Sequence, residues 1–368
     1  MKQEVSDGKQ KRRLLIAGGG TGGHVHAGIA VAEAWKARFG TQAEILFVGS
    51  ARGLEASLVP SAGYPLALLR LGTLNRVSWR QRLTTLFWMP WAMIRSLMLL
   101  VTFRPEAVIG VGGYASGPVV FLAAALEWIW GGHTAILEQN SVAGMTNRIL
   151  GRAVSKVFSA FGFKPGVFSA EKVVVTGNPI RSKFTPRPPA KRRPFHVLIF
   201  GGSQGAVGLN SVVIETLEHL RSHRNEITFT HQTGALDVPR VREMYEKNGL
   251  KAEVLPFIQD MSSAYERSSL VICRAGASSL AEIAAVGRAA ILIPLPTAAD
   301  NHQEFNARCF SDQGAARLLN QKEINSSVLA QEILRFFEQP ELIDEMEQKV
   351  KWFYRPNAAQ EIVHHLIR

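Results

Sequence analysis

A glycine-rich turn that directly follows an apolar run occurs twice in this chain, at matching places in its two halves. The first copy is GGGTGGH (18–24), after Leu14–Ala17, and the second is GGSQG (201–205), after Val197–Phe200. Each copy is typical of a buried strand, a bare-backbone turn and a helix. Glycine lets backbone N–H groups approach a bulky anion closely, and the helix adds its positive N-terminal end. The repeat predicts two similar nucleotide-binding-type domains that face one cleft.

The length of the chain and its alternating apolar runs predict two α/β domains. A chain of 368 residues is too long for one ordinary core, and its 46% apolar content is typical of globular proteins. Short apolar runs alternate with helical patterns, which is typical of parallel sheets covered on both faces by helices. The predicted strands are Leu14–Ala17, Ile45–Val48, Ala107–Ile109, Thr134–Leu137, Lys172–Val175, Val197–Phe200, Ile227–His231, Ala252–Leu255, Leu270–Cys273 and Ala289–Ile293.

A proline- and arginine-rich stretch, TPRPPAKRRP (185–194), separates the two halves. Such a stretch does not form a core and is typical of a linker between domains. We therefore expect one domain over residues 1–180 and a second over residues 181–351. A last helix, Asn357–Arg368, follows Pro356. We expect the segment 352–368 to cross back to the first domain.

The positive charge of the chain is concentrated in its first half. Residues 1–180 carry 19 Lys and Arg against 9 Asp and Glu, a net charge of +10, whereas residues 181–368 carry 23 against 21, a net charge of +2. The interval between Glu55 and Glu106 contains no acidic residue but contains Arg70, Arg76, Arg80, Arg82, Arg95 and Arg104. A localised basic face indicates an anionic partner, either a nucleic acid or a membrane surface.

The apolar segment TTLFWMPWAMIRSLMLLVTF (84–103) favours the membrane. It is as long as a bilayer span, which takes ~20 residues, but Arg95 in its interior and Pro90 argue against a span. The region 76–103 combines Arg76, Arg80 and Arg82 with Trp79, Leu83, Phe87, Trp88, Trp91 and Met93, a pattern typical of a helix in the membrane interface. We expect contact with an anionic membrane surface; a core crossover helix and a true span are the alternatives. Tryptophan-rich apolar surface is not a base-stacking platform, so we expect no nucleic acid.

The first glycine turn matches the Gly-x-Gly-x-x-Gly pattern of dinucleotide-binding proteins but lacks their acidic partner. In those proteins an Asp or Glu at the end of the second strand holds the ribose hydroxyls. Here Ile45–Val48 ends in Gly49-Ser50, so NAD binding is disfavoured. The chain has no Gly-x-x-x-x-Gly-Lys-Ser/Thr motif, which excludes a P-loop enzyme. The alternative for the turn is that it only permits close packing of a strand and a helix.

Further segments carry groups suited to a nucleotide sugar. His24 closes the first turn, where it is either a general base or a loop histidine that caps backbone groups. GVGGYASGP (110–118) follows a strand and is either a further anion cradle, which with the first turn would embrace a diphosphate, or a close-packing turn. RAGASSLAE (274–282) opens a helix that suits a phosphate, with Glu282 placed to accept hydrogen bonds from two ribose hydroxyls. DNHQ (300–303) suits a sugar, or caps a helix.

Seven motifs in order carry a resemblance to a known family: GGGTGGH, GVGGYASGP, EQNSVAGMTNR, TGNPIR, GGSQGA, CRAGASSLAEIAAVGRAAILIPLP and DNHQEFNA. From about residue 13 to its end, the chain resembles the cell-wall N-acetylglucosaminyltransferases. The resemblance implies a GT-B fold, with an N-terminal acceptor domain and a C-terminal UDP-GlcNAc domain. It implies transfer of GlcNAc from UDP-GlcNAc to the C4 hydroxyl of MurNAc in lipid I (undecaprenyl-diphospho-MurNAc-pentapeptide), which gives lipid II with inversion. The family works in peptidoglycan synthesis, peripherally at the cytoplasmic face of the cell membrane, and other cell-wall synthesis proteins are possible partners.

The resemblance also implies site residues, with no metal and no cofactor. The donor-binding positions carried over are Thr21, Gly22, Gly23, Asn140, Arg181, Ser203, Ile258, Arg274, Ala277, Ser278, Ser279, Leu280, Ala281, Glu282 and Gln303. Arg274 and Ile258 would lie at the uracil. Ser203 and the helix from Ala277 would lie at the diphosphate. Glu282 would hold the ribose, and Gln303 would read the GlcNAc hydroxyls. His24 and Glu282 are the predicted catalytic positions, with His24 or a nearby carboxylate as the base.

The chain departs from the family pattern on the acceptor side. Leu137 stands where the family has histidine, and His26-Ala27 replaces an aromatic residue and a proline. The family's proline after Asn140 is also replaced, within Ser141-Val142-Ala143-Gly144. These differences concern the acceptor and not the reaction class. The competing interpretations are another nucleotide-sugar enzyme, such as a UDP-GlcNAc epimerase, and a non-catalytic UDP-sugar-binding or membrane scaffold protein.

Overall fold

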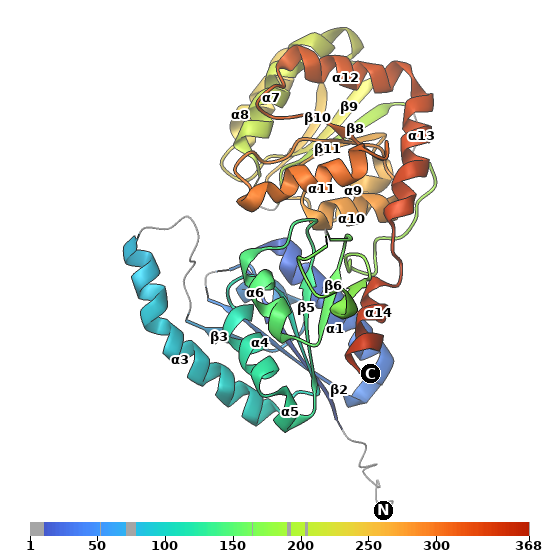
Figure 1. Cartoon of the computed structure of the whole chain (residues 1–368). Helices are drawn as coiled ribbons and strands as arrows, with labels where there is room; N and C mark the ends of the chain where they lie inside the picture. The colour runs from blue at the N-terminus through green and yellow to red at the C-terminus, as the bar shows by residue number, and fades with distance from the viewer. Residues whose placement is uncertain are drawn as a thin grey trace, which may run out of the picture. The chain divides into compact units, whose positions relative to one another are not determined.

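The chain divides into two compact units, shown in Figure 1. The computed structural model describes residues 11–51, 53–70, 79–163, 165–189, 193–202 and 205–367, with only the backbone described over 79–86. The first unit comprises Met1–Gln139, Ala143–Arg181 and Asn357–Arg368, and the second comprises Asn140–Val142 and Ser182–Pro356. Each unit is built around one parallel sheet.

The first unit has a seven-stranded parallel sheet in the order β3-β2-β1-β4-β5-β6-β7. Its strands are β1 (Arg12–Gly18), β2 (Ala43–Ser50), β3 (Leu66–Leu69), β4 (Ala107–Gly112), β5 (His133–Glu138), β6 (Lys156–Ser159) and β7 (Val173–Val175). Its helices are α1 (Gly22–Phe39), α2 (Glu55–Ser61), α3 (Trp79–Phe103), α4 (Ser116–Ala125), α5 (Glu127–Trp130), α6 (Met145–Ala153) and α14 (Ala358–Leu366). Because side chains alternate along a strand, β1 sends Leu14 and Ile16 into one core and Leu15 and Ala17 into another.

The C-terminal helix α14 is part of the first unit. Ile362, Val363 and Leu366 of α14 are buried in the same core as Trp35 of α1. Burial of apolar surface contributes about 25 cal/mol per Å² to the free energy of unfolding. A helix from the C-terminal end of the chain therefore stabilises the first unit.

The second unit has a six-stranded parallel sheet in the order β10-β9-β8-β11-β12-β13. Its strands are β8 (Phe195–Phe200), β9 (Ile227–Gln232), β10 (Lys251–Leu255), β11 (Leu270–Cys273), β12 (Ala290–Leu292) and β13 (Arg317–Leu318). Its helices are α7 (Val207–Thr216), α8 (Val238–Asn248), α9 (Met261–Arg267), α10 (Ala277–Val286), α11 (His302–Ser311), α12 (Ser326–Glu338) and α13 (Pro340–Val350). Short 3₁₀ helices in the two units cover Gly40–Gln42, Ala170–Lys172, Leu217–His223, Ala299–Asn301 and Lys351–Phe353.

Each predicted strand falls on a strand of the structure, although Ala289 and Ile293 lie outside β12, and three further strands were not predicted. The unpredicted strands are β3, β6 and β13, of which β3 and β13 lie at sheet edges and are short. Lys172 was wrongly assigned to a strand, because Ala170–Lys172 forms a 3₁₀ turn and β7 begins at Val173. The described part of the predicted linker, 185–189 and 193–194, contains no helix or strand, as its prolines require.

Helix α3 covers the stretch that raised the question of a membrane span. Among the described residues, the structure contains no helix that is long and apolar enough to cross a membrane. Ala92 and Ser96 of α3 are buried, whereas Trp91, Ile94 and Met98 are exposed. Over its described side chains, 87–103, the helix therefore packs along one face, so the alternative of an ordinary core helix describes only that face.

Candidate functional site

The strand order brings the first glycine turn (18–24) and the segment GVGGYASGP (110–118) together. In the first sheet the order reverses between β1 and β4, and ligands of open parallel sheets bind at such a switch point. Gly18 of β1 pairs with Gly112 of β4, and the Gly19 N–H donates to the Gly112 carbonyl at 3.0 Å. A Cβ on Gly113, which has a φ of +84°, would lie 2.4 Å from the Gly19 carbonyl oxygen. Only glycine therefore allows the two turns to lie this close.

His24 lies in the first turn of α1, directly beside these glycines. Its Nδ1 is 3.0 Å from the Gly19 carbonyl oxygen, and a Cβ on Gly112 would lie 2.8 Å from its Nε2. Because a carbonyl only accepts, Nδ1 of the neutral ring carries the proton and Nε2 keeps its lone pair. The side chain thus makes the local backbone contact that the capping interpretation expected. The same contact leaves Nε2 in the state that a general base needs.

The other predicted residues of this turn begin the helix. Thr21 is the exposed N-cap residue of α1, and its hydroxyl lies 3.5 Å from the His24 amide nitrogen. Gly22 and Gly23 are the first two helical residues and are partly exposed. All three therefore lie within one turn of His24.

Glu55, which the sequence analysis did not single out, contacts the same glycine turn. Its side chain is buried, with Oε2 accepting from the Gly20 N–H at 2.7 Å and Oε1 accepting from the Ser50 N–H and hydroxyl, each at 2.8 Å. An internal carboxylate therefore accepts the hydrogen bond of the Gly20 amide, one of the N–H groups of the turn for which an anion cradle was one of two alternatives. A signal was present in the sequence, since EASLVP (55–60) begins a helix a few residues after β2 with an acidic residue.

The second sheet has its own switch point, between β8 and β11. Phe200 at the end of β8 pairs with Cys273 at the end of β11, so the loops after these strands leave the same edge of the sheet. Gly201 and Arg274, which follow these paired ends, therefore begin neighbouring loops. Ser203, the predicted diphosphate contact, lies outside the described residues.

Helix α10 starts at this edge and carries six of the fifteen predicted donor positions, residues 277–282. Gly276 is its N-cap residue, and Ala277, Ser278, Ser279, Leu280 and Ala281 form its first turns. The N–H groups of residues 277–279 precede the first helical hydrogen bond, which the Leu280 N–H donates to the Gly276 carbonyl at 3.0 Å. Glu282 is 8% exposed and accepts a hydrogen bond from the Tyr265 hydroxyl at 3.3 Å. The Glu282 carboxylate, which lies inside α10, is thus oriented by the buried Tyr265 of α9.

Arg274 and Ile258 are buried rather than open to solvent. The Arg274 guanidinium donates to the carbonyl oxygens of Ile293 and Pro294, at 2.9 and 3.2 Å, and burial lowers its pKa. Its side chain therefore holds the segment that follows β12. Ile258, after β10, is 6% exposed.

The remaining predicted contacts lie on loops and on α11. Gln303 of α11 accepts through Oε1 from the Leu295 N–H at 3.0 Å, so it is tied to the segment that Arg274 holds. Asn140 groups with the second unit, where its Oδ1 accepts from Nδ2 of Asn306 at 3.1 Å. Asn306 is fully buried and was not predicted. Arg181 is partly buried at the end of the first unit's main segment.

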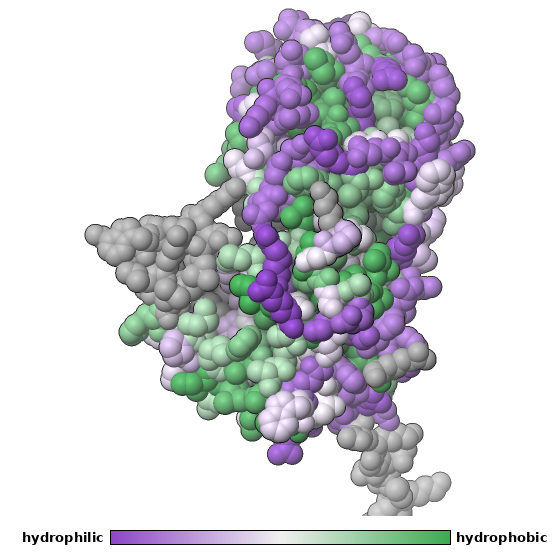
Figure 2. Space-filling view, in the orientation of Figure 1, coloured by the Kyte–Doolittle hydropathy of each residue, from purple (hydrophilic) through white to green (hydrophobic). Residues whose placement is uncertain are grey.

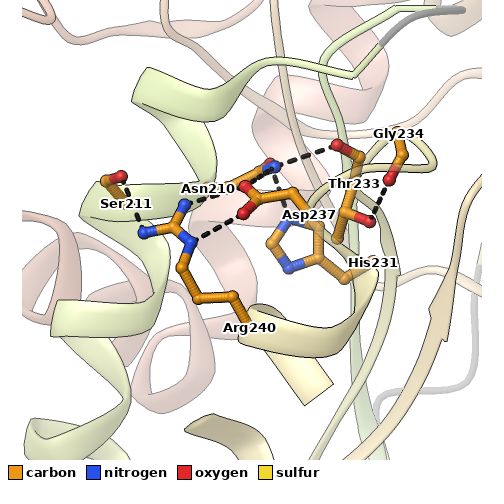
Figure 3. Close-up of polar contacts among 7 residues, drawn as sticks. All are labelled: Asn210, Ser211, His231, Thr233, Gly234, Asp237 and Arg240. Carbon is orange, nitrogen blue, oxygen red and sulfur yellow. Dashed lines mark hydrogen bonds and ion pairs between the residues drawn. The ribbon is translucent and has the colours of Figure 1, made fainter. Parts of the chain in front are cut away.

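A polar network around the buried residues Asn210 and His231 lies beside Gly205, and Figure 3 shows this network. Asn210 of α7 donates through Nδ2 to the Thr233 carbonyl at 3.0 Å and to Asp237 at 2.7 Å, and its Oδ1 accepts from Nε2 of His231 at 3.1 Å. A Cβ on Gly205, which has a φ of +76°, would lie 2.0 Å from the same Thr233 carbonyl oxygen. The glycine turn therefore lies directly against a peptide that Asn210 fixes.

The charges of this network are set by burial and pairing. Burial lowers the pKa of His231 to about 3, so its ring is neutral, with Nδ1 accepting from the Tyr245 hydroxyl at 3.3 Å. Arg240 binds both oxygens of Asp237, at 2.6 and 2.8 Å, and these hydrogen bonds hold the pKa of Asp237 below its usual value. The network is thus a neutral histidine beside a paired carboxylate.

Comparisons with known proteins agree along nearly the whole chain. Residues 14–159 match the glycosyltransferase family 28 N-terminal domain, and residues 196–362 match the family's C-terminal domain. The UDP-N-acetylglucosamine--N-acetylmuramyl-(pentapeptide) pyrophosphoryl-undecaprenol N-acetylglucosamine transferase of Myxococcus xanthus (strain DK1622) is 45% identical over 353 residues, which covers 95% of this chain and 91% of that protein. The protein of the same name from Syntrophus aciditrophicus (strain SB) is 44% identical, with 95% and 97% covered.

A solved structure agrees with the sequence relatives. The crystal structure of MurG from Acinetobacter baumannii has a TM-score of 0.77 and 32% sequence identity to this chain, and the match covers 96% of this chain and 99% of that one. The predicted family and GT-B fold are thereby confirmed. The chain belongs to glycosyltransferase family 28 and is a GT-B glycosyltransferase of the MurG family.

Proposed function

We propose that this chain transfers GlcNAc from UDP-GlcNAc to the C4 hydroxyl of MurNAc in lipid I, which forms lipid II in peptidoglycan synthesis. The observation that carries this proposal is the 45% identity, over 95% of the chain, to a transferase named for that reaction. The site geometry supports the assignment of roles to individual residues.

The second unit binds the donor in this proposal. Backbone N–H groups at the start of α10, together with Ser203, receive the diphosphate of UDP, since a helix N-terminus attracts anions. Glu282, oriented by Tyr265, accepts hydrogen bonds from the ribose hydroxyls. Ile258 and Arg274 lie at the uracil, and Gln303 and Asn140 contact the GlcNAc unit. Arg181, at the end of the first unit's main segment, is a further donor-binding position.

The first unit supplies the base. Nε2 of His24 takes the proton of the MurNAc C4 hydroxyl as its oxygen attacks the anomeric carbon of GlcNAc. The bond from that carbon to the β-phosphate oxygen breaks, and UDP leaves with the electron pair. The attack inverts the anomeric carbon through an oxocarbenium-like transition state. Thr21, Gly22 and Gly23 lie beside this base at the start of α1.

An exposed apolar face of the first unit supports peripheral binding to the cytoplasmic face of an anionic membrane. Phe87, Trp91 and Val101 of α3 and Trp128 of α5 are 76%, 55%, 60% and 83% exposed. Figure 2 shows green, hydrophobic surface on this side of the unit. Arg95 and Arg104 are exposed on or next to the same helix, and cations beside apolar side chains suit an anionic lipid surface. The predicted contributions of Arg76, Trp79, Arg80, Arg82 and Leu83 lie outside the described side chains.

Transfer of labelled GlcNAc from UDP-GlcNAc to a lipid I analogue, measured with and without EDTA, tests the proposal. We expect a lipid-linked disaccharide in both conditions, because fixed dipoles and Ser203 stabilise the leaving UDP in place of a metal. Formation of an epimerised nucleotide sugar, with no lipid product, would contradict the transferase assignment. An absolute metal requirement would contradict the metal-free mechanism.

A further inference from the structure

The hydrogen bonds of Glu55 and His24 meet at a single peptide group. The peptide that joins Gly19 to Gly20 donates its N–H to Glu55 Oε2 at 2.7 Å. The carbonyl of that same peptide accepts from Nδ1 of His24 at 3.0 Å. A carboxylate and a histidine are thus connected in series, through the two ends of one rigid, planar amide.

Glu55 is built into this position and does not reach it from solvent. It is 1% exposed, and the three donors that the structure gives it are the neutral groups of Gly20 and Ser50. A Cβ on Gly19, Gly49 or Gly53 would lie 2.0–2.5 Å from atoms of the Glu55 side chain. Three glycines therefore leave room for one buried carboxylate. If this side chain only filled space, larger residues at the glycine positions could fill the same space.

The series arrangement has an electronic consequence at the ring. An amide whose N–H donates to a carboxylate carries more negative charge on its own carbonyl oxygen, because hydrogen bonds in a chain polarise one another. That oxygen holds the proton of His24 on Nδ1 and keeps the lone pair on Nε2. It also stabilises the positive charge that the ring gains when Nε2 accepts a proton, as a carboxylate does in a histidine–aspartate pair.

We propose that Glu55 is a positioning residue for the transfer reaction, acting on His24 through the Gly19–Gly20 peptide. The inference rests on the proposed function, in which His24 is the base. It assigns the buried carboxylate of Glu55, which contacts the first glycine turn, to the acid–base chemistry of the acceptor and not to ribose or diphosphate binding.

A double-mutant cycle tests this coupling in the full-length protein. Glu55→Gln should lower kcat about 10- to 100-fold, the range seen when a reactive histidine loses its outer hydrogen-bond partner, with KM for UDP-GlcNAc unchanged. In the His24→Ala background the same substitution should have no further effect on kcat, because Glu55 acts only through His24. Equal losses in both backgrounds, or a raised donor KM with kcat intact, would overturn the proposal.

Two controls separate positioning from folding. Glu44→Gln removes a surface carboxylate of β2 that pairs with Arg13, and it should leave kcat unchanged. Glu55→Asp keeps the charge and should restore part of the activity that Glu55→Gln loses, whereas a space-filling role predicts that the shorter side chain is the worse variant.

A spectroscopic measurement keeps this inference distinct from the proposed function. Recorded at alkaline pH, the ¹⁵N shifts of the His24 ring should place the proton on Nδ1 in the wild-type protein and show a loss of that preference in Glu55→Gln. If His24→Ala keeps full transferase activity, the role of His24 as base is wrong even where these shifts behave as expected. If the Glu55→Gln shifts equal those of the wild type, the coupling itself is wrong.

Discussion

Oδ1 of Asn210 lies 3.1 Å from Nε2 of His231, and this contact joins the helix after the second glycine turn to the end of the neighbouring strand. Both residues are fully buried. Asn210 uses its two N–H groups as well, on Thr233 and Asp237, so its side-chain amide is satisfied on every side. A single buried asparagine of the second unit therefore fixes the Thr233 peptide, on which Gly205 of the predicted diphosphate turn packs.

Asn210→Ala should weaken both the fold and donor binding. It leaves Asp237, the Thr233 carbonyl and His231 without their shared partner, which costs about 1–3 kcal/mol of unfolding free energy for each buried polar group left unpaired. Because the Thr233 peptide packs on Gly205, KM for UDP-GlcNAc should also rise. Urea unfolding and initial rates measure the two effects, with Ser211→Ala as the control that removes only an exposed bond to Arg240. A loss of stability with unchanged KM would limit the network to folding.

The stability of the chain should fall as the pH falls below 6.5, through His231. Its pKa is about 3 in the folded chain and 6.5 ordinarily, so the unfolded chain binds a proton that the folded chain refuses. The stabilisation is complete above pH 6.5 and is lost between pH 6.5 and about 3, at ~1.4 kcal/mol per pH unit. Urea unfolding at pH 7 and pH 5 should therefore show a loss of roughly 2 kcal/mol from this residue. His231→Gln should lack this part of the slope, and an identical slope in the variant would contradict the assignment.

His24→Ala should abolish most of the transfer while sparing donor binding. Loss of a general base lowers kcat about 10²- to 10⁴-fold. The affinity for UDP, measured by calorimetry, should stay the same, because the positions proposed for the uracil, the ribose and the diphosphate lie on the second unit. The exposed His219→Ala serves as the matched control and should keep wild-type turnover. A His24→Ala enzyme with near wild-type kcat would assign the base elsewhere.

Trp91→Glu should reduce binding to anionic vesicles. It places a charge on the exposed face of α3, where an interfacial helix buries apolar side chains, and the partition coefficient should fall about tenfold or more. Trp352→Glu is the control, since Trp352 is equally an exposed tryptophan, at 65%, but lies in the second unit. Vesicle co-sedimentation measures both variants. Equal losses in the two variants, or no loss in either, would argue against a membrane face on α3.

The site residues that the sequence predicts in the glycine-rich segments are those with local signals. His24, Gly22 and Gly23 close a glycine turn, and Ala277–Glu282 follow a strand end, so their neighbours in sequence reveal their place. Glu55, Asn210 and Asn306 were missed because their partners are distant. Glu55 binds an amide 35 residues before it, and Asn210 binds residues 21 to 27 positions further along. The sequence places Arg274 in the loop after a strand. That its guanidinium donates to two carbonyls of the segment after β12 depends on packing.

The sequence alone determined that this protein consists of two α/β domains with a glycine turn at the start of each. Apolar runs, glycines and prolines act on the few residues around them, so strands such as Leu270–Cys273 are recognisable without the fold. Only the tertiary structure decided what those turns contact. The strand order sets Gly18 beside Gly112 and places the Gly19–Gly20 peptide between Glu55 and His24. These contacts depend on sheet order and burial, which no local pattern contains.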